Sequence, residues 1–261
     1  LKLKMAQWNK QEQQYRSQDT SLFEVVMVAD QNGNPLNTYG SSANIPIAAG
    51  NVTGYTHINK FGYRDTLAST YQAIWDGSTA YSYVSTPGVA SVVSDDGGDT
   101  GNLIDIQGLD GDYNLVTETI AVGSTGSQVF SRVFRAICQS ECAGRVDINV
   151  DSAIRATILA GANQTLMAIY TVPAGKTAYL VKFQGSIDKS NGECKFRLMV
   201  RPEGGAFNVK GQFGTAAGST VTYDYPIPLK FEEKTDIEIR AVSGATLGAG
   251  AIFDLILVDN V

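Results

Sequence analysis

Residues 103–122 read LIDIQGLDGDYNLVTETIAV, and this stretch decides the fold class of the chain. In its first half Ile104 and Ile106 alternate with polar side chains, and in its second half Val116 and Ile120 do the same. Alternation with a period of two places one face of a strand on a core and leaves the other face in water. The turn formers of DGDYN separate the two halves. The stretch therefore predicts an antiparallel β-hairpin.

Short strands separated by turns continue on both sides of this hairpin. Residues 73–84 and 89–94 are candidate strands before it, and VFSRVFRAI (129–137) is the next candidate strand after it. From residue 151 onward there are eight further candidate strands. They cover residues 153–160, 164–172, 177–187, 194–202, 207–213, 221–231, 236–243 and 251–258. Evenly spaced short strands with Gly-rich turns predict a β-sandwich, and a set of eight favours a jelly roll.

The N-terminal part of the chain differs from the rest. LKLKMAQWNKQEQQYRSQDT (1–20) is polar and free of Gly and Pro, with Trp8 and Tyr15 among its few apolar side chains. SLFEVVMVAD (21–30) is a candidate strand, and a loop rich in Gly, Ser and Asn follows it. Such a segment frays when it stands alone, so we expect it to lie across a neighbouring subunit.

These patterns predict an all-β protein of two β-sandwich or jelly-roll-like domains with an extended N-terminal arm. We assign residues 1–48 to the arm and its linker, residues 49–150 to a β-sandwich and residues 151–261 to a jelly-roll-like β-sandwich. Neither helical periodicity nor the βαβ alternation of a parallel sheet is found between residues 20 and 261.

The composition excludes several classes of function. A net charge of −6 and a pI of about 4.8 argue against a nucleic-acid surface, which needs a basic field. No window approaches the roughly 18 apolar residues of a membrane span, and no secretory leader is visible. The three cysteines, Cys138, Cys142 and Cys194, do not suit a disulfide framework or a zinc site, so we expect reduced thiols and synthesis in a cytoplasm. No cofactor is predicted.

GYTHINKFGYRDT (54–66) holds His57, the only histidine of the chain. His57 and Asp65 suit a general base and its orienting group, but no nucleophile motif such as GxSxG accompanies them. We therefore predict no catalytic residue and expect His57 to pack and hydrogen-bond between strands. Tyr gives a large contact area and is enriched at interfaces, and several tyrosines lie in this third of the chain. The predicted interface residues are Trp8, Tyr15, Tyr55, His57, Phe61, Tyr63 and Arg64.

The hairpin turn offers the one local match to a cation site. Asp110, Asp112 and Asn114 have the D-x-D-x-N spacing that opens a calcium loop. The Gly expected at the sixth position and the Glu expected at the twelfth are missing. We expect a polar hairpin turn here, with an ordered cation as the alternative.

Several long phrases of the chain resemble, in order, a group of virion structural proteins of tailed phages from marine and cyanobacterial hosts. The phrases are residues 19–66, IWDGSTAYSYVST (74–86), IQGLDGDYNLVTETIAVG (106–123), FSRVFRAI (130–137) and QTLMAIYTVPAGKTAYLVKF (164–183). The resemblance implies a particle component assembled in the host cytoplasm, and it implies no catalytic residues.

Three functions remain open at this point. The first is a non-enzymatic capsid decoration or cement protein that binds the particle by its N-terminal arm, contacts the major capsid protein and forms a symmetric homo-oligomer. The alternative is a tail or baseplate fibre or adaptor protein that contacts tail proteins and whose C-terminal domain binds a host surface glycan. The third is a depolymerase enzyme, which we disfavour because such enzymes usually show long β-helix repeats.

Overall fold

The computed structural model describes residues 44–260, apart from residues 68, 78, 79, 190, 191 and 217. The predicted strand 21–30 and the arm residues Trp8 and Tyr15 lie outside the described residues. The chain forms two compact units, residues 1–52 and 53–261. In the first unit the helix α2, Asn44–Ala48, takes the place of part of the expected loop.

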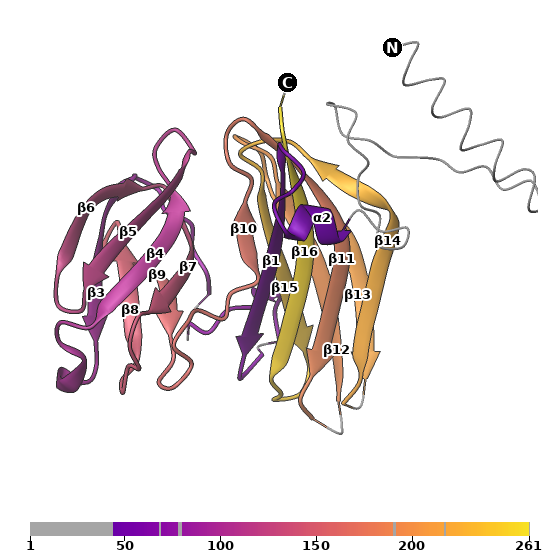
Figure 1. Ribbon diagram of the computed structural model, residues 1–261. Helices are drawn as coiled ribbons and strands as arrows, with labels where there is room; N and C mark the ends of the chain where they lie inside the picture. Colours follow the sequence, from indigo (N-terminus) through magenta and orange to yellow (C-terminus); the bar gives the residue numbers. More distant parts are fainter. Residues whose placement is uncertain (1–43, 68, 78–79, 190–191, 217, 261) are drawn as a thin grey trace, which may run out of the picture. The chain divides into compact units, whose positions relative to one another are not determined.

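The second unit is built from antiparallel strands, which confirms the predicted all-β class. Its larger sandwich has the strand orders β1-β16-β11-β14 in one sheet and β10-β15-β12-β13 in the other (Figure 1). The bounds are β1 Tyr55–Arg64, β10 Ile169–Thr171, β11 Lys176–Ile187, β12 Glu193–Arg201, β13 Asn208–Ala216, β14 Thr220–Phe231, β15 Asp236–Ser243 and β16 Ala249–Asp259. Eight strands in these two orders form a jelly roll. Phe183, Phe196 and Phe253 are fully buried in its core.

The smaller sandwich also has two sheets, with strand orders β6-β3-β8-β9 and β5-β4-β7. The bounds are β3 Gly88–Ser94, β4 Leu103–Leu109, β5 Leu115–Ala121, β6 Thr125–Phe130, β7 Arg132–Cys138, β8 Val146–Val150 and β9 Ala153–Ile158. The predicted hairpin is confirmed, with Ile104 opposite Ile120 across β4 and β5. Both side chains are buried, so the face that alternation placed on a core is the inner face.

One predicted strand, 129–137, is two strands in the structure. The chain crosses from one sheet to the other at Ser131, between β6 and β7. The Ser131 backbone N–H donates to the Leu109 carbonyl at 2.7 Å, so the crossing is hydrogen-bonded to the end of β4. The apolar run continues through the corner because both sheets bury their inner faces, and periodicity alone therefore does not reveal the break.

The smaller sandwich is inserted into one strand of the jelly roll. The two-residue strand β2, Gln72–Ala73, and β10 pair with successive parts of β15. Ala73 lies opposite Arg240, and Ile169 lies opposite Glu238. The chain leaves the jelly roll after β2, builds the smaller sandwich and returns in β10 to continue the same strand.

The predicted domain ranges 49–150 and 151–261 do not match this strand pairing. β1, expected in the first domain, pairs along its whole length with β16 of the jelly roll. β9, expected in the second domain, pairs with β8 of the smaller sandwich. A jelly roll of eight strands is therefore present, but β1 takes the place that the sequence order suggested for β9. Pairing between strands far apart in the chain leaves no local signal in the sequence.

The two chain segments that join the sandwiches form a narrow neck, defined here as residues 74–76 and 166–168. Trp75 and Met167 form an isolated antiparallel bridge. The Ala168 N–H donates to the Ile74 carbonyl at 2.9 Å. The neck lies directly on Gly62 of β1, where a Cβ atom would come within 2.3 Å of the Ala168 nitrogen. Glycine at position 62 therefore allows the neck to cross β1.

Candidate functional site

A group of charged side chains lies where the smaller sandwich meets the jelly roll. Cations and aromatic rings alternate there in one stack. In order, its members are Lys234, Tyr113, Arg132, Tyr83, Arg201, Phe207 and Arg240. Each cation lies between 4.3 and 5.6 Å from the centre of the neighbouring ring. Such pairs contribute about 0.5–2 kcal/mol each, more when they are shielded from water.

Asp236, at the start of β15, holds two of these cations. Its carboxylate accepts from the Arg132 Nε at 2.8 Å and from the Arg201 Nε at 2.9 Å, and Thr171 also donates to it. The Asp236 side chain is only 3% exposed, so these ion pairs are poorly screened by water. Burial lowers the pKa of Arg132, but the Asp236 carboxylate raises it. The net result is a pKa above the usual value. Arg132 comes from β7, so Asp236 links the two sandwiches.

Glu238, two residues further along β15, makes a second link across the junction. Its carboxylate accepts from the Tyr83 hydroxyl at 2.9 Å and pairs with Arg240. Burial raises the pKa of Glu238 above its usual value, although Arg240 and Tyr83 act in the opposite direction. The side chains at positions 236 and 238 on one strand therefore hold residues of both sandwiches.

A third set of contacts joins β1 to β7. The buried Lys60 ammonium donates to the Phe134 carbonyl, and Arg135 donates from Nη2 to the Asn59 carbonyl at 2.8 Å. Burial, and then the neighbouring Arg135, lower the pKa of Lys60 well below its usual value. Contacts from three strands of the jelly roll thus fix how the smaller sandwich is held.

The junction contains a cleft of about 460 Å³, called here the junction cleft. It is lined by Tyr83, Val84, Ser85, Tyr113, Arg132, Arg201, Pro202, Glu203, Gly204, Gly205, Lys234 and Asp236. Its volume lies within the range of small-molecule sites. Arg201 and Lys234 keep about a quarter of their side chains exposed, at 27% and 29%, so both cations reach the solvent in the cleft.

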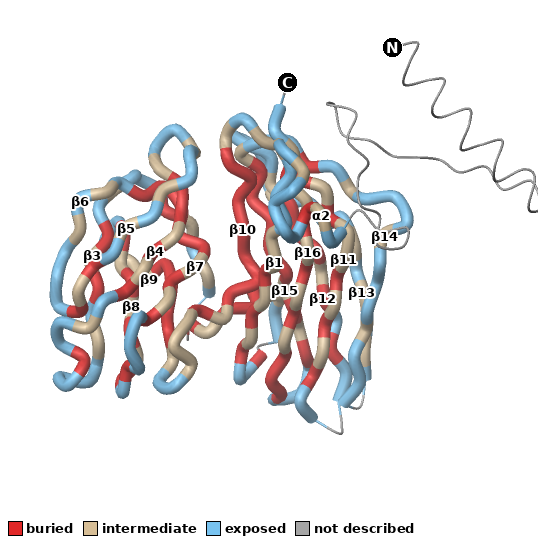
Figure 2. Tube along the Cα trace, viewed as in Figure 1, coloured by how far each residue is buried: buried red, intermediate tan, exposed pale blue. Residues whose placement is uncertain are grey.

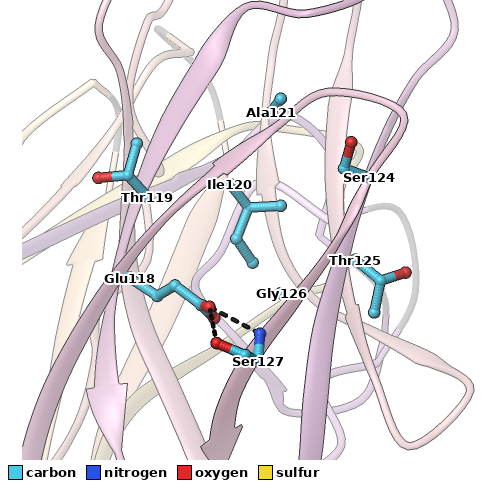
Figure 3. Close-up of a pocket in the computed structure, with 8 residues that line it drawn as sticks. All are labelled: Glu118, Thr119, Ile120, Ala121, Ser124, Thr125, Gly126 and Ser127. Atoms are coloured by element: carbon cyan, nitrogen blue, oxygen red, sulfur yellow. Dashed lines mark hydrogen bonds between the residues drawn. The ribbon is translucent and has the colours of Figure 1, made fainter.

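A smaller open groove of about 270 Å³ lies between β5 and β6 (Figure 3). The Glu118 carboxylate reaches across it and accepts from the Ser127 backbone N–H at 2.7 Å and from the Ser127 hydroxyl at 3.0 Å. It also accepts from the Gln128 N–H at 3.1 Å. These bonds tie the two sheets together at one side of the smaller sandwich, so Glu118 is engaged in holding the fold.

His57 lies on β1, and its ring is paired with the carboxylate of Asp254 on β16, with Nε2 and Oδ1 3.1 Å apart. Asp254 also accepts from the Asn59 amide at 2.7 Å. Asp65, weighed above as an orienting group for His57, does not take this place. The His57 side chain is 41% exposed and lines neither of the two cavities described above. The pair therefore lies on the outer face of a sheet.

The other predicted interface residues on β1 divide between surface and interior. Tyr55 is 41% exposed, whereas Phe61 and Tyr63 are half-buried. The Tyr63 hydroxyl donates to Asp188 at 2.9 Å, and burial with this contact raises the pKa of Tyr63 to about 12. Arg64 is buried and donates to the Gly77 carbonyl at 3.2 Å, so its guanidinium holds a loop and is not available to a partner.

The predicted cation turn is closed by its own hydrogen bonds. Asp110 accepts from the backbone N–H groups of Asp112 at 2.8 Å and Asn114 at 2.9 Å, and from the Asn114 amide. Burial acts upward on the pKa of Asp110, but these hydrogen bonds bring it below its usual value. The arrangement is the expected polar hairpin turn.

No group of three potential metal-ligating His, Cys, Asp or Glu side chains occurs among the described residues. Across residues 44–260, with the gaps given above, no helix has the length and apolarity to span a bilayer. Cys138, Cys142 and Cys194 are buried and form no disulfide with one another. Burial raises the pKa of the Cys138 thiol to about 12 and that of Cys194 to about 11.

The sequence reading missed the residues of the junction. Arg132 and Asp236 are 104 positions apart in the sequence. The pattern of polar and apolar residues around each of them does not show that they meet. The one signal was the pair of arginines, Arg132 and Arg135, that interrupts the apolar run 129–137. Both arginines make contacts across the junction.

Comparison with known proteins gives no family assignment. No protein-family model and no curated protein matches the chain. Among solved structures the chain is similar to proteins in the structures of infectious bursal disease virus Gt strain and Gx strain, with 9% identity in both cases and TM-scores of 0.21 and 0.22. A structure of infectious bursal virus derived T=1 particles is similar at 10% identity and a TM-score of 0.18. These alignments cover 79–80% of this chain and 71–74% of the other chains. At these scores the likeness carries no argument about function.

Proposed function

We propose that this chain is a non-enzymatic structural protein of a virion, a capsid decoration or cement protein that assembles as a symmetric oligomer and attaches to the particle by residues 1–48. The observation that carries the proposal is a set of exposed apolar side chains on β13 and β14. We call it the β13–β14 surface and define it by Val209, Tyr223 and Ile227, which are 48%, 43% and 83% exposed.

The β13–β14 surface lies at the open side of the jelly roll. β13 ends the strand order of one sheet and β14 ends that of the other, so among the described residues each has one edge without a neighbouring strand. Figure 2 shows exposed and half-buried residues along almost the whole of both strands, in contrast to the buried strands beside them. Long edge strands with exposed apolar side chains are sites of association, and proteins usually protect them.

A local distortion raises Ile227 out of the β14 strand. Between the pairs Leu180–Leu229 and Lys182–Asp224 the register of β11 and β14 shifts, so that four residues of β14 face one of β11. Those four residues include two prolines, which lack the N–H group needed for continuous pairing. The bulge therefore presents an apolar side chain at its centre instead of another hydrogen-bonded strand edge.

The sequence of β14 favours a second copy of the chain as the partner. Asp224 precedes Ile227 by three residues and Lys230 follows it by three, so a two-fold contact centred on Ile227 would bring the acidic side of one copy toward the basic side of the other. Two opposite-charge pairs would then flank an apolar centre. A symmetric contact of this kind is what a repeated component of a particle surface requires.

The composition of purified particles tests the role in the virion. We expect mass spectrometry of particles to detect the chain in many copies, comparable with other capsid components. Removal of residues 1–20 is expected to abolish particle binding while the circular dichroism of the domains is unchanged, because the domains hold their own cores. A few copies per particle would instead support the tail or baseplate alternative. Full occupancy after the truncation would contradict attachment through the arm.

A further inference from the structure

We infer that the junction cleft binds an acidic saccharide, a sugar that carries a carboxylate as well as hydroxyl groups. The inference goes beyond the proposed role, because attachment to a particle and self-association through β14 do not need this cleft. It stands on the residues that line the cleft and on how many of their polar atoms are already used.

The cleft is cationic on an acidic protein. Arg132, Arg201 and Lys234 face two carboxylates, Glu203 and Asp236, which leaves one positive charge in excess, whereas the whole chain carries −6. Clefts lined by an excess of one charge concentrate its field, so the lining favours an anionic group.

Two cations keep donors free for a ligand. Arg201 donates to Asp236 through Nε and Nη2, so its Nη1 group is not used in these bonds. Lys234 makes one long contact, 3.4 Å from Nζ to Glu203, and has three protons to donate. Arg201 and Lys234 both line the cleft, and a carboxylate accepts well from a guanidinium and from an ammonium. The Arg132 guanidinium already donates to Asp236, the Ser131 carbonyl and the Tyr113 hydroxyl. It therefore holds one wall of the cleft in place.

The acidic and aromatic lining selects a sugar over a simple anion. The Glu203 side chain is 53% exposed and stands beside Lys234, where its carboxylate accepts from the hydroxyl groups of a sugar. Tyr83 and Tyr113 add ring edges and apolar surface for the CH groups of a sugar ring. A neutral sugar has no use for the excess positive charge. A ligand with both a carboxylate and hydroxyl groups satisfies every part of the lining.

Calorimetric titration of the full chain tests the inference. The probes are a galacturonate trimer, a hyaluronan tetrasaccharide and sialyllactose as acidic sugars, a neutral galactose trimer, and inorganic phosphate. We expect at least one acidic sugar to bind with 1:1 stoichiometry, and the neutral trimer and phosphate to bind at least about tenfold more weakly. Lys234→Met is expected to weaken the acidic sugar about tenfold or more, and Glu203→Gln to weaken it several-fold.

Lys195→Met is the matched control, because Lys195 is an exposed lysine of β12 that does not line the cleft. It is expected to leave sugar binding within about twofold of wild type. No binding of any acidic probe at about 10 mM by a folded protein overturns the inference. So does equal binding of phosphate or of the neutral trimer. The Lys234→Met variant is expected to occupy particles as fully as the wild type. The sugar site and the proposed role in the virion are therefore tested independently of each other.

Discussion

At the scale of single residues, the side chain that links the two sandwiches is Asp236, which no local sequence pattern singled out. His57, the residue that stood out, pairs with Asp254 on the outer face of a sheet. Asp236 is almost fully buried and receives hydrogen bonds from Arg132, Arg201 and Thr171. Removing one partner of a buried ion pair leaves the other charge uncompensated, and this cost is much larger than that of losing an exposed pair. The Asp254 and Asp236 pairs differ in burial, which cannot be read from the sequence.

Asp76 in the neck predicts how stability depends on pH. Burial raises the pKa of its carboxyl to about 7, against the opposing effect of the hydrogen bond from the Leu166 N–H. A carboxyl group with a raised folded-state pKa binds its proton more tightly in the folded than in the unfolded state. Its contribution to stability is therefore complete below the unfolded value of about 3.9 and is lost as the pH rises through about 7.

Asp76→Asn is expected to remove this dependence. Between pH 5 and pH 7 the wild type should lose up to about 2–3 kcal/mol that the variant keeps, since one pKa unit corresponds to about 1.4 kcal/mol. The measurement is urea unfolding at pH 5, 6, 7 and 8. Asp112→Asn removes the same charge from an exposed turn and should follow the wild-type profile. Equal pH slopes for wild type and Asp76→Asn would contradict the assignment.

At the scale of elements, β14 is the strand whose role differs from that of its neighbours. β11 and β16 bury alternate side chains in the core, whereas β14 has a single fully buried residue, Phe231. Its bulge and its two prolines prevent pairing with a further strand, which limits open-ended association through the backbone. The exposed side chain of Ile227 gives a contact of limited size, which suits a closed two-fold pair.

Ile227→Asp is expected to abolish self-association. In the proposed two-fold contact the two introduced carboxylates would face each other, so like-charge repulsion adds to the loss of apolar contact. Native mass spectrometry and light scattering should show a dimer for the wild type and a monomer for the variant. Val93→Asp is the matched control, because Val93 is 50% exposed on β3 of the smaller sandwich. A wild type that is monomeric at all accessible concentrations, or a dimer that survives Ile227→Asp, would refute the contact.

At the scale of the whole molecule, three features couple the inserted sandwich to the jelly roll. They are the neck, the stack of cations and aromatic rings at the junction, and the contacts of β1 with β7. The neck alone is two short segments, which would permit relative motion. The ion pairs of Asp236 and the hydrogen bonds of Lys60 and Arg135 add links that must break if the sandwiches separate. We therefore expect residues 53–261 to unfold as one cooperative unit.

Asp236→Asn tests this coupling. The substitution keeps the shape of the side chain but leaves Arg132 and Arg201 without their shared counter-charge, and it should cost about 3 kcal/mol or more. Asp259→Asn, which breaks an exposed pair with Lys176, should cost at most about 1 kcal/mol. Urea unfolding followed by tryptophan fluorescence and by circular dichroism should give one coincident transition for the wild type. Two separate transitions in the wild type would show that the sandwiches fold independently.

The sequence by itself determined the fold class and most of the strands, although it did not mark β1 or β8, and among the described residues the candidate strand 73–84 is not a strand beyond Ala73. The hairpin of residues 103–121 and the strands from residue 153 onward follow from period-two alternation and turn residues, which act over a few positions and are visible locally. The tertiary structure alone decided which strands pair, that β1 completes the jelly roll and that the smaller sandwich interrupts it between β2 and β10. It also decided the junction, where Arg132 and Asp236 meet from 104 positions apart. The physical reason is that strand pairing and buried ion pairs are set by contacts between distant segments, while alternation records only which face of a strand is buried.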